Sequence, residues 1–356
     1  MRLIDLLPGE VTQVNLTVEL RETEITGLTA DSRAVEPAAI SNGATAILAP
    51  TGTTVTDNKT ALITSSDARA ALAHMAAAFY SDQPETIAAV TGTNGKTSVA
   101  HFTRQIWSMT GHPAVSMGTL GLQLPDGSVK PSLTTPDPVT LHADLAELAR
   151  KGVDHVVMEA SSHGLDQRRL DGVKLRAAAF TNLSRDHLDY HGTLDAYLAA
   201  KTRLFSALLP TDGTAVLNAD IPETESLTKA FGGRVISYGR NATELKLLAA
   251  EPSHSGTRIQ LNAFGRQTDI DLPLAGDFQV YNVLCAAGLA IACGEDSEHA
   301  IACLPRLTGV PGRLEQAGTV NGGSVYIDYA HTPDALENVL AAMRPHTTNR
   351  LIDVFG

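Results

Sequence analysis

The chain has 356 residues, which suggests two or three domains if each takes roughly 100–200 residues. It carries 27 Lys and Arg against 39 Asp and Glu, which gives a net charge of −12. Nucleic acids and anionic membranes bind basic surfaces, so this charge argues against either as a partner. No apolar run approaches the ~20 residues that cross a bilayer, and the N-terminal sequence MRLIDLLPGE has acids where a signal peptide has an apolar stretch.

The first 86 residues have the pattern of a small α/β domain. Short apolar and polar runs alternate as far as an alanine-rich helical stretch, Ala68–Phe79. The pattern then breaks at Ser81–Pro84, as it does in a linker. We therefore predict an N-terminal domain over residues 1–86.

A strand, a glycine-rich turn and a helix follow from Thr86 onward, in TIAAVTGTNGKTSVAHFTRQIW. Further strand-like runs occur at His155–Met158, Ala177–Thr181 and Thr214–Asn218, with helical stretches between them. Strands that alternate with helices indicate βαβ units and a mostly parallel sheet. We predict an α/β fold with a central phosphate-loop domain over residues 87–310.

A second boundary is predicted near Gly309–Gly312. A strand at Ser324–Asp328, a helix at Asp334–Met343 and a strand at Arg350–Phe355 are expected after it. A single βαβ unit of under about fifty residues buries too little surface to be stable alone. We therefore expect residues 311–356 to be the incomplete start of a Rossmann-like C-terminal domain.

The cysteines argue for a reducing environment. Cys285, Cys293 and Cys303 are odd in number and have no CxxC spacing. Buried thiols in a cytoplasmic protein fit this pattern better than disulfides or a zinc site.

The strongest chemical motif is VTGTNGKTS at Val90–Ser98, between an apolar run and a helix. Backbone N–H groups and the helix N-terminus bind phosphate in this context, and glycines let the backbone approach closely. Lys96 would reach the terminal phosphates and the Thr97 hydroxyl would bind Mg²⁺. The full Walker spacing requires glycine at the position of Val90, so this loop is a shortened version. The generic Walker pattern alone therefore does not establish a phosphate-binding loop here.

Two polar segments follow strand-like runs. MEASSHG at Met158–Gly164 contains Glu159, and TNLSRDHLDYH at Thr181–His191 contains His187. Ligands of open α/β sheets bind at the carboxyl ends of strands, where carboxylate and imidazole suit Mg²⁺ or phosphate chemistry. A single histidine would be an ordinary loop residue, but two such segments beside a phosphate loop favour a functional site.

Two further residues cannot be assigned from spacing. Lys201 lies in a predicted helix, Leu194–Leu208, where a lysine is ordinarily a solvated surface residue. Nothing in the helix-like run Gly276–Ala292 singles out Asn282.

The chain closely resembles the Mur ligases, which build the peptide stem of peptidoglycan. The matching pieces run in order along nearly the whole chain: DSRAVEP, TGTNGKTS, LTTPDP, MEASSHGLDQRR, FTNLSRDHLDYHGT, AGDFQVYN, GVPGRLE and DYAHTPDALE. The GTNGKT loop is shared with folylpolyglutamate synthetases. The pair SSHGLDQ and NLSRDHLDYHG is more particular to the branch that adds the third residue of the stem.

The resemblance implies a UDP-binding N-terminal domain, a central ATPase domain and a Rossmann-like C-terminal domain. It implies an ATP- and Mg²⁺-dependent amide ligase whose partners are UDP-N-acetylmuramoyl-L-alanyl-D-glutamate and an amino acid, meso-diaminopimelate being expected. The D-Glu carboxylate attacks the ATP γ-phosphate, and the amine of the amino acid then displaces phosphate from the acyl phosphate. Lysine and Mg²⁺ would neutralise the two anions that meet in the first step.

The resemblance also implies roles for individual residues. ATP would contact the phosphate loop and four residues further along the chain: Gly92, Thr93, Asn94, Gly95, Lys96, Thr97, Ser98, Asn282, Arg313, Asp328 and His331. Mg²⁺ would be held by Thr97, Glu159 and His187. The muramyl-peptide substrate would contact Ser32 (on the uridine side), Thr134, Thr135, Ser161, Gln167 and Arg169. Lys96, His187 and Lys201 are the expected catalytic residues, and Lys201 matches a lysine that is carbamylated (N6-carboxylysine) to give an anionic oxygen ligand near Mg²⁺.

Two departures from the family pattern leave alternatives open. After DSRAVEP the segment Ala38–Thr45 is shorter than usual, and the segment that selects diaminopimelate or lysine is absent. We expect a cytoplasmic monomer that does not turn over by itself, because the amino acid has no site. The alternatives are an L-lysine-adding ligase, another Mur or folylpolyglutamate-type ligase, and an inactive nucleotide-binding fragment.

Overall fold

The structure is a computed structural model that describes residues 1–8, 12–14, 24–28, 36–41, 43–54, 59–253, 256–321, 323–330, 333–347 and 349–354. Its chain forms two compact units. The first comprises Met1–Glu85, Thr135–Gly152 and His163–Lys174, and the second comprises Thr86–Thr134, Val153–Ser162 and Leu175–Gly356. The first unit thus includes two segments from the predicted central domain, and the boundaries at 86 and 310 stay predictions.

The first unit is built around helix α4 (Ala68–Phe79). Strand β3 (Ala61–Ser65) pairs parallel with β2 (Ala46–Pro50) and antiparallel with β1 (Thr12–Val14). The predicted helix at 68–79 is confirmed, and it begins there because the Asp67 carboxylate accepts a hydrogen bond from the backbone N–H of Ala70 at 3.0 Å. The described residues of this unit also form α1 (Leu3–Leu6), α3 (Glu36–Ser41) and α6 (Pro138–Arg150). Helix α7 (Ser162–Asp166) begins on the last residue of a second-unit segment and continues into this unit.

The second unit is built on a large sheet, in agreement with the predicted parallel α/β architecture. Across the described residues its eleven strands follow the order β14-β13-β12-β11-β10-β9-β4-β8-β5-β6-β7. All neighbouring pairs from β12 to β5 in this order are parallel, and β4 lies between β9 and β8. The parallel strands are β4 (Thr86–Thr91), β5 (Ala114–Gly118), β8 (His155–Glu159), β9 (Ala177–Phe180), β10 (Thr214–Asn218), β11 (Arg234–Gly239) and β12 (Leu245–Ser253).

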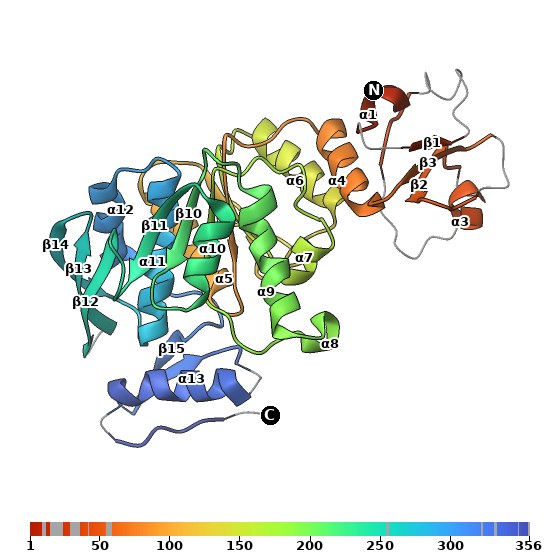
Figure 1. The fold of residues 1–356 in the computed structure, drawn as a ribbon. Coiled ribbons are helices and arrows are strands. Elements are labelled where there is room, and N and C mark those ends of the chain that lie inside the picture. The colour runs from red at the N-terminus through yellow and green to blue at the C-terminus, as the bar shows by residue number, and fades with distance from the viewer. Residues whose placement is uncertain are drawn as a thin grey trace. The chain divides into compact units, whose positions relative to one another are not determined.

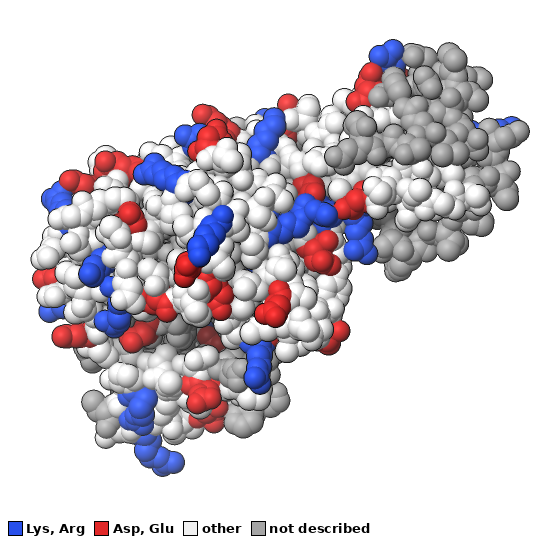
Figure 2. All heavy atoms as spheres, viewed as in Figure 1, with Lys and Arg blue, Asp and Glu red and all other residues white. Residues whose placement is uncertain are grey.

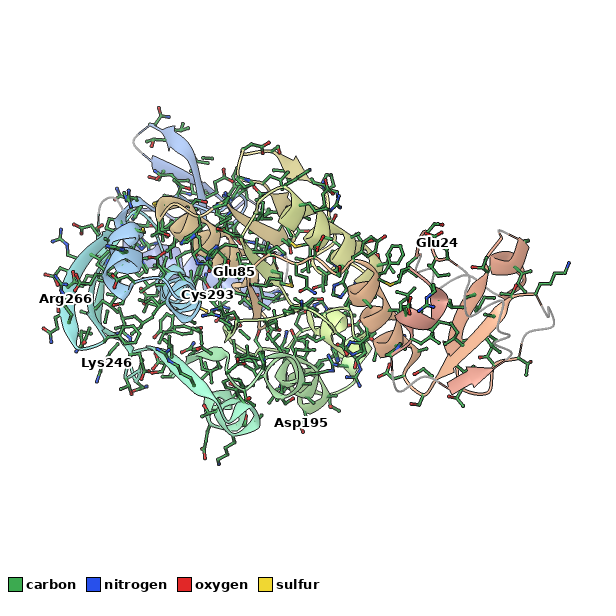
Figure 3. The ribbon with its side chains drawn as sticks, turned by 90° about the horizontal axis from the view of Figure 1, so that it is seen from above. Glu24, Glu85, Asp195, Lys246, Arg266 and Cys293 are labelled. Atoms are coloured by element: carbon green, nitrogen blue, oxygen red, sulfur yellow. The ribbon has the colours of Figure 1, made fainter. Side chains whose placement is uncertain are left out.

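Antiparallel strands extend both ends of this sheet. β13 (Gly256–Ala263) and β14 (Arg266–Leu272) follow β12, and β6 (Gly121–Gln123) and β7 (Val129–Lys130) follow β5. Along β13 buried and exposed residues alternate, as expected for a sheet that is covered on one face. Figure 3 shows Lys246 and Arg266 extending outward from this region, whereas Cys293 lies inside the protein.

Helices α5 (Lys96–Met109) and α11 (Asp277–Ala292) pack against each other and against the central strands, as Figure 1 shows. Strand β4 is buried along its whole length because both faces are covered, which explains its continuous apolar run. Trp107 and Phe102 of α5 and Leu284 of α11 belong to the main core. Before the C-terminal segment, the described residues of this unit also form α8 (Leu188–His191), α9 (Leu194–Arg203), α10 (Glu223–Phe231) and α12 (Ser297–Cys303), with single turns at Leu204–Leu208 and Leu304–Arg306.

The C-terminal segment corrects one prediction. Strand β16 (Gly323–Ile327) and helix α13 (Pro333–Met343) match the predicted strand and helix, and a turn follows at Arg344–His346. Strand β15 (Glu315–Val320), which sequence analysis missed, pairs antiparallel with β16. The predicted strand at 350–355 is wrong for its described residues, 350–354, which are not in a sheet. A strand requires a hydrogen-bonded neighbour, and an apolar run does not supply one.

The remaining observations concern the cysteines, the helix lengths and the surface charges. The three cysteines are buried and free, as predicted. Among the described residues, no helix combines the length and apolar character needed to span a bilayer. On the face shown in Figure 2, acidic and basic side chains of the described residues are interspersed.

Candidate active site

The phosphate loop joins β4 to α5 in the way that the sequence predicts. Gly92, with φ at +139°, allows close contact with the next strand, because a Cβ there would lie 1.9 Å from the Thr181 hydroxyl. Gly95 is the N-cap of α5 in the left-handed conformation, and Lys96 is its first residue. The N–H groups at the start of α5 therefore remain without intrahelical partners and point toward the loop.

A segment after β9 holds this loop in place. The backbone N–H of Thr93 donates to the Asn182 carbonyl at 2.8 Å. The Asn182 side chain accepts from the Asn94 N–H at 3.0 Å and donates to the Asn94 carbonyl at 3.2 Å. The Thr181 hydroxyl also donates to that carbonyl, at 2.6 Å. The first half of the TNLSRDH segment therefore positions the phosphate loop.

Two lysines converge on one carbonyl of the loop. Lys96 Nζ donates to the Gly92 carbonyl at 2.9 Å, and Lys201 Nζ donates to the same oxygen at 2.7 Å. Burial lowers the pKa of Lys96, and the nearby carboxylates of Glu159 and Asp186 oppose this effect. A negatively charged phosphate would therefore meet two amine hydrogen-bond donors at this point.

Lys201 is buried, contrary to the ordinary surface reading of a helical lysine. It lies on α9, is 1% exposed, and its Nζ is 4.3 Å from the centre of the Tyr197 ring. Burial, and secondly the charge of Lys96, lower its pKa to about 6. Because this value is below neutral pH, the amine is mainly unprotonated and nucleophilic.

Glu159 ends β8 and is almost fully buried. The backbone N–H of Thr119 donates to its Oε1 at 2.8 Å, and the Thr119 hydroxyl donates to Oε2 at 3.3 Å. Gly118 leaves room for this carboxylate, since a Cβ there would lie 2.0 Å from Oε1. Glu159 and Thr97 line the same small cavity. These two oxygen donors suit Mg²⁺, which prefers hard oxygen ligands.

His187 follows Asp186 in the second polar segment and adopts φ of +51°. Its Nε2 lies 3.5 Å from the Asp186 carboxylate, and its ring centre lies 6.2 Å from that of Tyr197. The Tyr197 hydroxyl donates to the Thr93 hydroxyl at 3.3 Å, so His187 belongs to the shell of residues around the loop.

The predicted nucleotide-side residues occupy several positions. A Cβ at Gly95 would lie 2.3 Å from the Asn282 amide oxygen, so Asn282 borders the loop. The charge of Arg313 contributes to the lowered pKa of Lys96, which places this guanidinium in the same electrostatic environment. Asp328 accepts hydrogen bonds from the backbone N–H groups of Leu314 and Ala330, each at 2.8 Å.

Three predicted substrate residues meet in the first unit. Arg169 donates to the Thr135 carbonyl at 2.6 Å and to the Gln167 side-chain oxygen at 2.7 Å. Thr134 belongs to the second unit, where its hydroxyl lies 3.1 Å from that of Thr119, and Ser161 also belongs to that unit. Ser32 and His331 lie outside the described residues.

Sequence reasoning missed three residues of this site. Thr119 holds Glu159, Tyr197 contacts both Thr93 and Lys201, and Asp186 is a charge partner of both lysines. Because Asp186 follows a predicted strand, its position in the sequence could have indicated that it belongs to the site. Thr119 and Tyr197 carry no signal in the sequence, because only the fold brings them to the loop.

Comparison with known proteins identifies the family of this chain. Residues 90–290 match the Mur ligase middle domain, and residues 312–356 match the Mur ligase glutamate ligase domain. The chain is 49% identical to the UDP-N-acetylmuramoyl-L-alanyl-D-glutamate–2,6-diaminopimelate ligases of Mesorhizobium japonicum and Brucella melitensis, covering 94% and 95% of this chain and 74% of each relative.

A solved structure of a UDP-N-acetylmuramoyl-L-alanyl-D-glutamate–2,6-diaminopimelate ligase is also similar. It superposes with a TM-score of 0.75 at 31% sequence identity, and the match covers 88% of this chain and 65% of the solved chain. The sequence match, the family models and the shared fold lead to one conclusion: this chain belongs to the Mur ligase family.

Proposed function

We propose that this chain is an ATP-dependent amide ligase that adds meso-diaminopimelate to UDP-N-acetylmuramoyl-L-alanyl-D-glutamate in peptidoglycan synthesis. The names of its relatives, 49% identical over most of this chain, support the reaction and the amino acid. The observation that carries the proposal is the convergence of Lys96 and Lys201 on the Gly92 carbonyl, in the electrostatic environment of Glu159 and Asp186. L-Lysine as the amino acid is the alternative that the test below decides.

In this reaction the substrate carboxylate must approach the γ-phosphate of ATP. The N–H groups at the start of α5 and the Lys96 ammonium would bind the phosphates, and the loop residues Gly92–Ser98 would surround them. Mg²⁺, when bound, would offset the charge of both anions. Thr97 and Glu159 supply oxygen donors for it, and His187 is proposed as the third ligand.

Lys201 is proposed to be carbamylated. A neutral amine adds to the carbon of CO₂ and releases one proton, giving an anionic carbamate. The pKa of Lys201, about 6, supports this step because the amine is uncharged at neutral pH. Incubation with ¹³C-bicarbonate should give a carbamate NMR signal that the Lys201→Arg variant lacks, and an identical signal in that variant would contradict the assignment.

The other predicted residues are proposed to bind the muramyl-peptide substrate or ATP. Thr134, Thr135, Ser161, Gln167 and Arg169 are proposed to bind the muramyl peptide, and the Arg169–Gln167 contact supports a polar binding surface in the first unit. Ser32 is proposed for the uridine. The proposed ATP contacts beyond the phosphate loop are Asn282, Arg313, Asp328 and His331. We also propose that the protein acts as a monomer in the cytoplasm, where its buried thiols stay reduced.

A phosphate-release assay tests the function. Contrary to the expectation from the sequence that the chain does not turn over by itself, the proposed function predicts phosphate release when the full chain receives Mg²⁺-ATP, the muramyl dipeptide and meso-diaminopimelate. The release should be weaker with L-lysine and absent with folates. Lys96→Ala should reduce the rate at least ~100-fold, because one cationic donor to the transferred phosphate is removed. Lys246→Ala, an exposed lysine on β12, is the matched control. Nucleotide binding without release would favour the inactive-fragment alternative, and release without the muramyl substrate would contradict the proposal.

A further inference from the structure

A second cluster of side chains with metal-binding atoms lies at the strand ends opposite to those that carry the phosphate loop. His112 lies between α5 and β5, and Asp154 and His155 lie at the start of β8. His155 pairs in register with Thr86 and Ala114, the first residues of β4 and β5. The cluster therefore lies at the amino ends of parallel strands, whereas the phosphate loop follows the carboxyl end of β4.

The three side chains bring metal-binding atoms together. His155 Nδ1 lies 2.8 Å from one oxygen of Asp154, and His112 Nδ1 lies 3.9 Å from the other. One possible ligand atom of each residue lies within 4.8 Å of the ligand atoms of the other two. Among the described residues, this is the cluster of at least three His, Cys, Asp or Glu side chains that meets this distance. Ligands of a tetrahedral zinc ion with bonds of about 2.0–2.1 Å lie roughly 3.3 Å apart. An ion shared by the three residues would therefore require the side chains to rotate toward it.

Both imidazoles have close neighbours, and their own ring centres lie 4.0 Å apart with an angle of 37° between the ring planes. His112 directs Nε2 toward Glu295 Oε2 at 3.6 Å, while its Nδ1 faces Asp154. A carboxylate on the far nitrogen of a histidine is the usual partner of a metal-bound imidazole. Glu295 is itself fixed, because its Oε1 accepts the backbone N–H of Asp296 at 3.0 Å. The His155 ring packs edge-on against Trp107, with the ring centres 4.9 Å apart.

We propose that His112, Asp154 and His155 form a binding site for one zinc-type divalent cation. Two imidazoles and one carboxylate suit Zn²⁺ or Co²⁺ and disfavour Mg²⁺, which selects oxygen ligands. A water molecule would complete the tetrahedron. The ion would link the α5–β5 loop to the start of β8, and through Glu295 to the α11–α12 loop, so its role is structural and separate from the ligase reaction.

Metal binding by the full chain tests this site directly. The metal-depleted protein is titrated with Zn²⁺ in the presence of excess Mg²⁺, and with Co²⁺ while the visible absorption is recorded. We expect one zinc equivalent that Mg²⁺ does not displace, a tetrahedral Co²⁺ spectrum and a higher Tm with zinc. His112→Gln should weaken this equivalent about 100-fold, and Glu295→Gln about tenfold, because it only orients His112.

Two controls make a negative result informative. His299→Gln changes an exposed histidine whose Nδ1 also lies 3.9 Å from Glu295 but which is outside the cluster, and zinc binding should stay unchanged. Asp154→Asn replaces the carboxylate without changing its size, and circular dichroism checks that each variant folds. Equal zinc stoichiometry and equal Co²⁺ spectra in the wild type, His112→Gln and Asp154→Asn would overturn the site. These readouts do not depend on ligase activity, so failure here leaves the proposed function untouched.

Discussion

At the scale of single residues, the site depends on positions with little steric tolerance. Gly92 approaches Thr181 so closely that a methyl group cannot be added without a shift. Thr93 uses its hydroxyl fully, since it accepts from the Ser184 N–H at 3.0 Å and from Tyr197, and it donates to the Ser184 carbonyl at 3.3 Å. The phosphate loop is therefore preorganised before any ligand arrives.

We expect Gly92→Ala to weaken ATP binding by more than tenfold. The added Cβ would overlap the Thr181 hydroxyl, and φ of +139° is strained for alanine. Isothermal titration with ATP measures the loss. Gly309→Ala is the matched control, because a Cβ there meets nothing within 4 Å. Unchanged affinity in Gly92→Ala would show that the loop adapts.

His101 gives a pH-dependent prediction. It lies on α5, its Nδ1 has no hydrogen-bond partner among the described residues, and burial lowers its pKa to about 4. Below pH 6.5 the unfolded chain therefore binds more protons at this site than the folded chain, and stability falls as the pH drops toward 4. The loss between pH 7.5 and 5 should be about 2 kcal/mol.

Urea unfolding of the wild type and of His101→Gln at the two pH values checks this. The variant should lose less stability on acidification, because glutamine does not titrate. Equal losses in the two proteins would show that the buried imidazole does not carry the effect.

At the scale of elements, the segment after β9 and helix α9 together build the phosphate loop's support. Thr181 and Asn182 hold the loop from one side, and α9 contributes Tyr197 and Lys201. Helix α9 begins at Leu194 because the Thr193 hydroxyl accepts the Ala196 N–H at 3.1 Å. The position of Lys201 is thus determined by a cap two helical turns away.

Asn182→Ala should reduce ATP affinity about tenfold while leaving the fold intact. It removes the reciprocal pair of hydrogen bonds to the Asn94 backbone, whose net loss is about 1–2 kcal/mol. Asn262→Ala is the control, since that side chain only caps the turn at Gly265. The same ATP affinity in both variants would mean that the loop needs no support from this segment.

At the scale of the whole molecule, binding of nucleotide should be visible as stability. A ligand that binds only the folded state at 100 times its Kd adds about 2.7 kcal/mol. Mg²⁺-ATP should therefore raise the Tm by a few degrees, and the increase should vanish in Lys96→Ala. Differential scanning calorimetry at several ATP concentrations measures it. A concentration-independent Tm would contradict specific nucleotide binding.

The local features could be predicted from the sequence: the phosphate loop between β4 and α5, the parallel strands around it and the buried cysteines. These depend on periodicity, glycine and short-range spacing, which the chain carries in its own order. The family resemblance named Lys201 and Glu159, but spacing alone left the lysine as a surface residue.

Which distant residues come into contact depends on the tertiary structure. Lys201 is buried because α9 places it on the Gly92 carbonyl, more than 100 positions away in the sequence. Thr119 reaches Glu159 because β5 and β8 are neighbours in the sheet. The expected strand at 350–355 shows what happens when no neighbour is available. Residues 350–354 have the composition of a strand, but among the described residues they do not pair with one. Hydrogen bonds and burial depend on neighbours in space, and a linear pattern does not specify them.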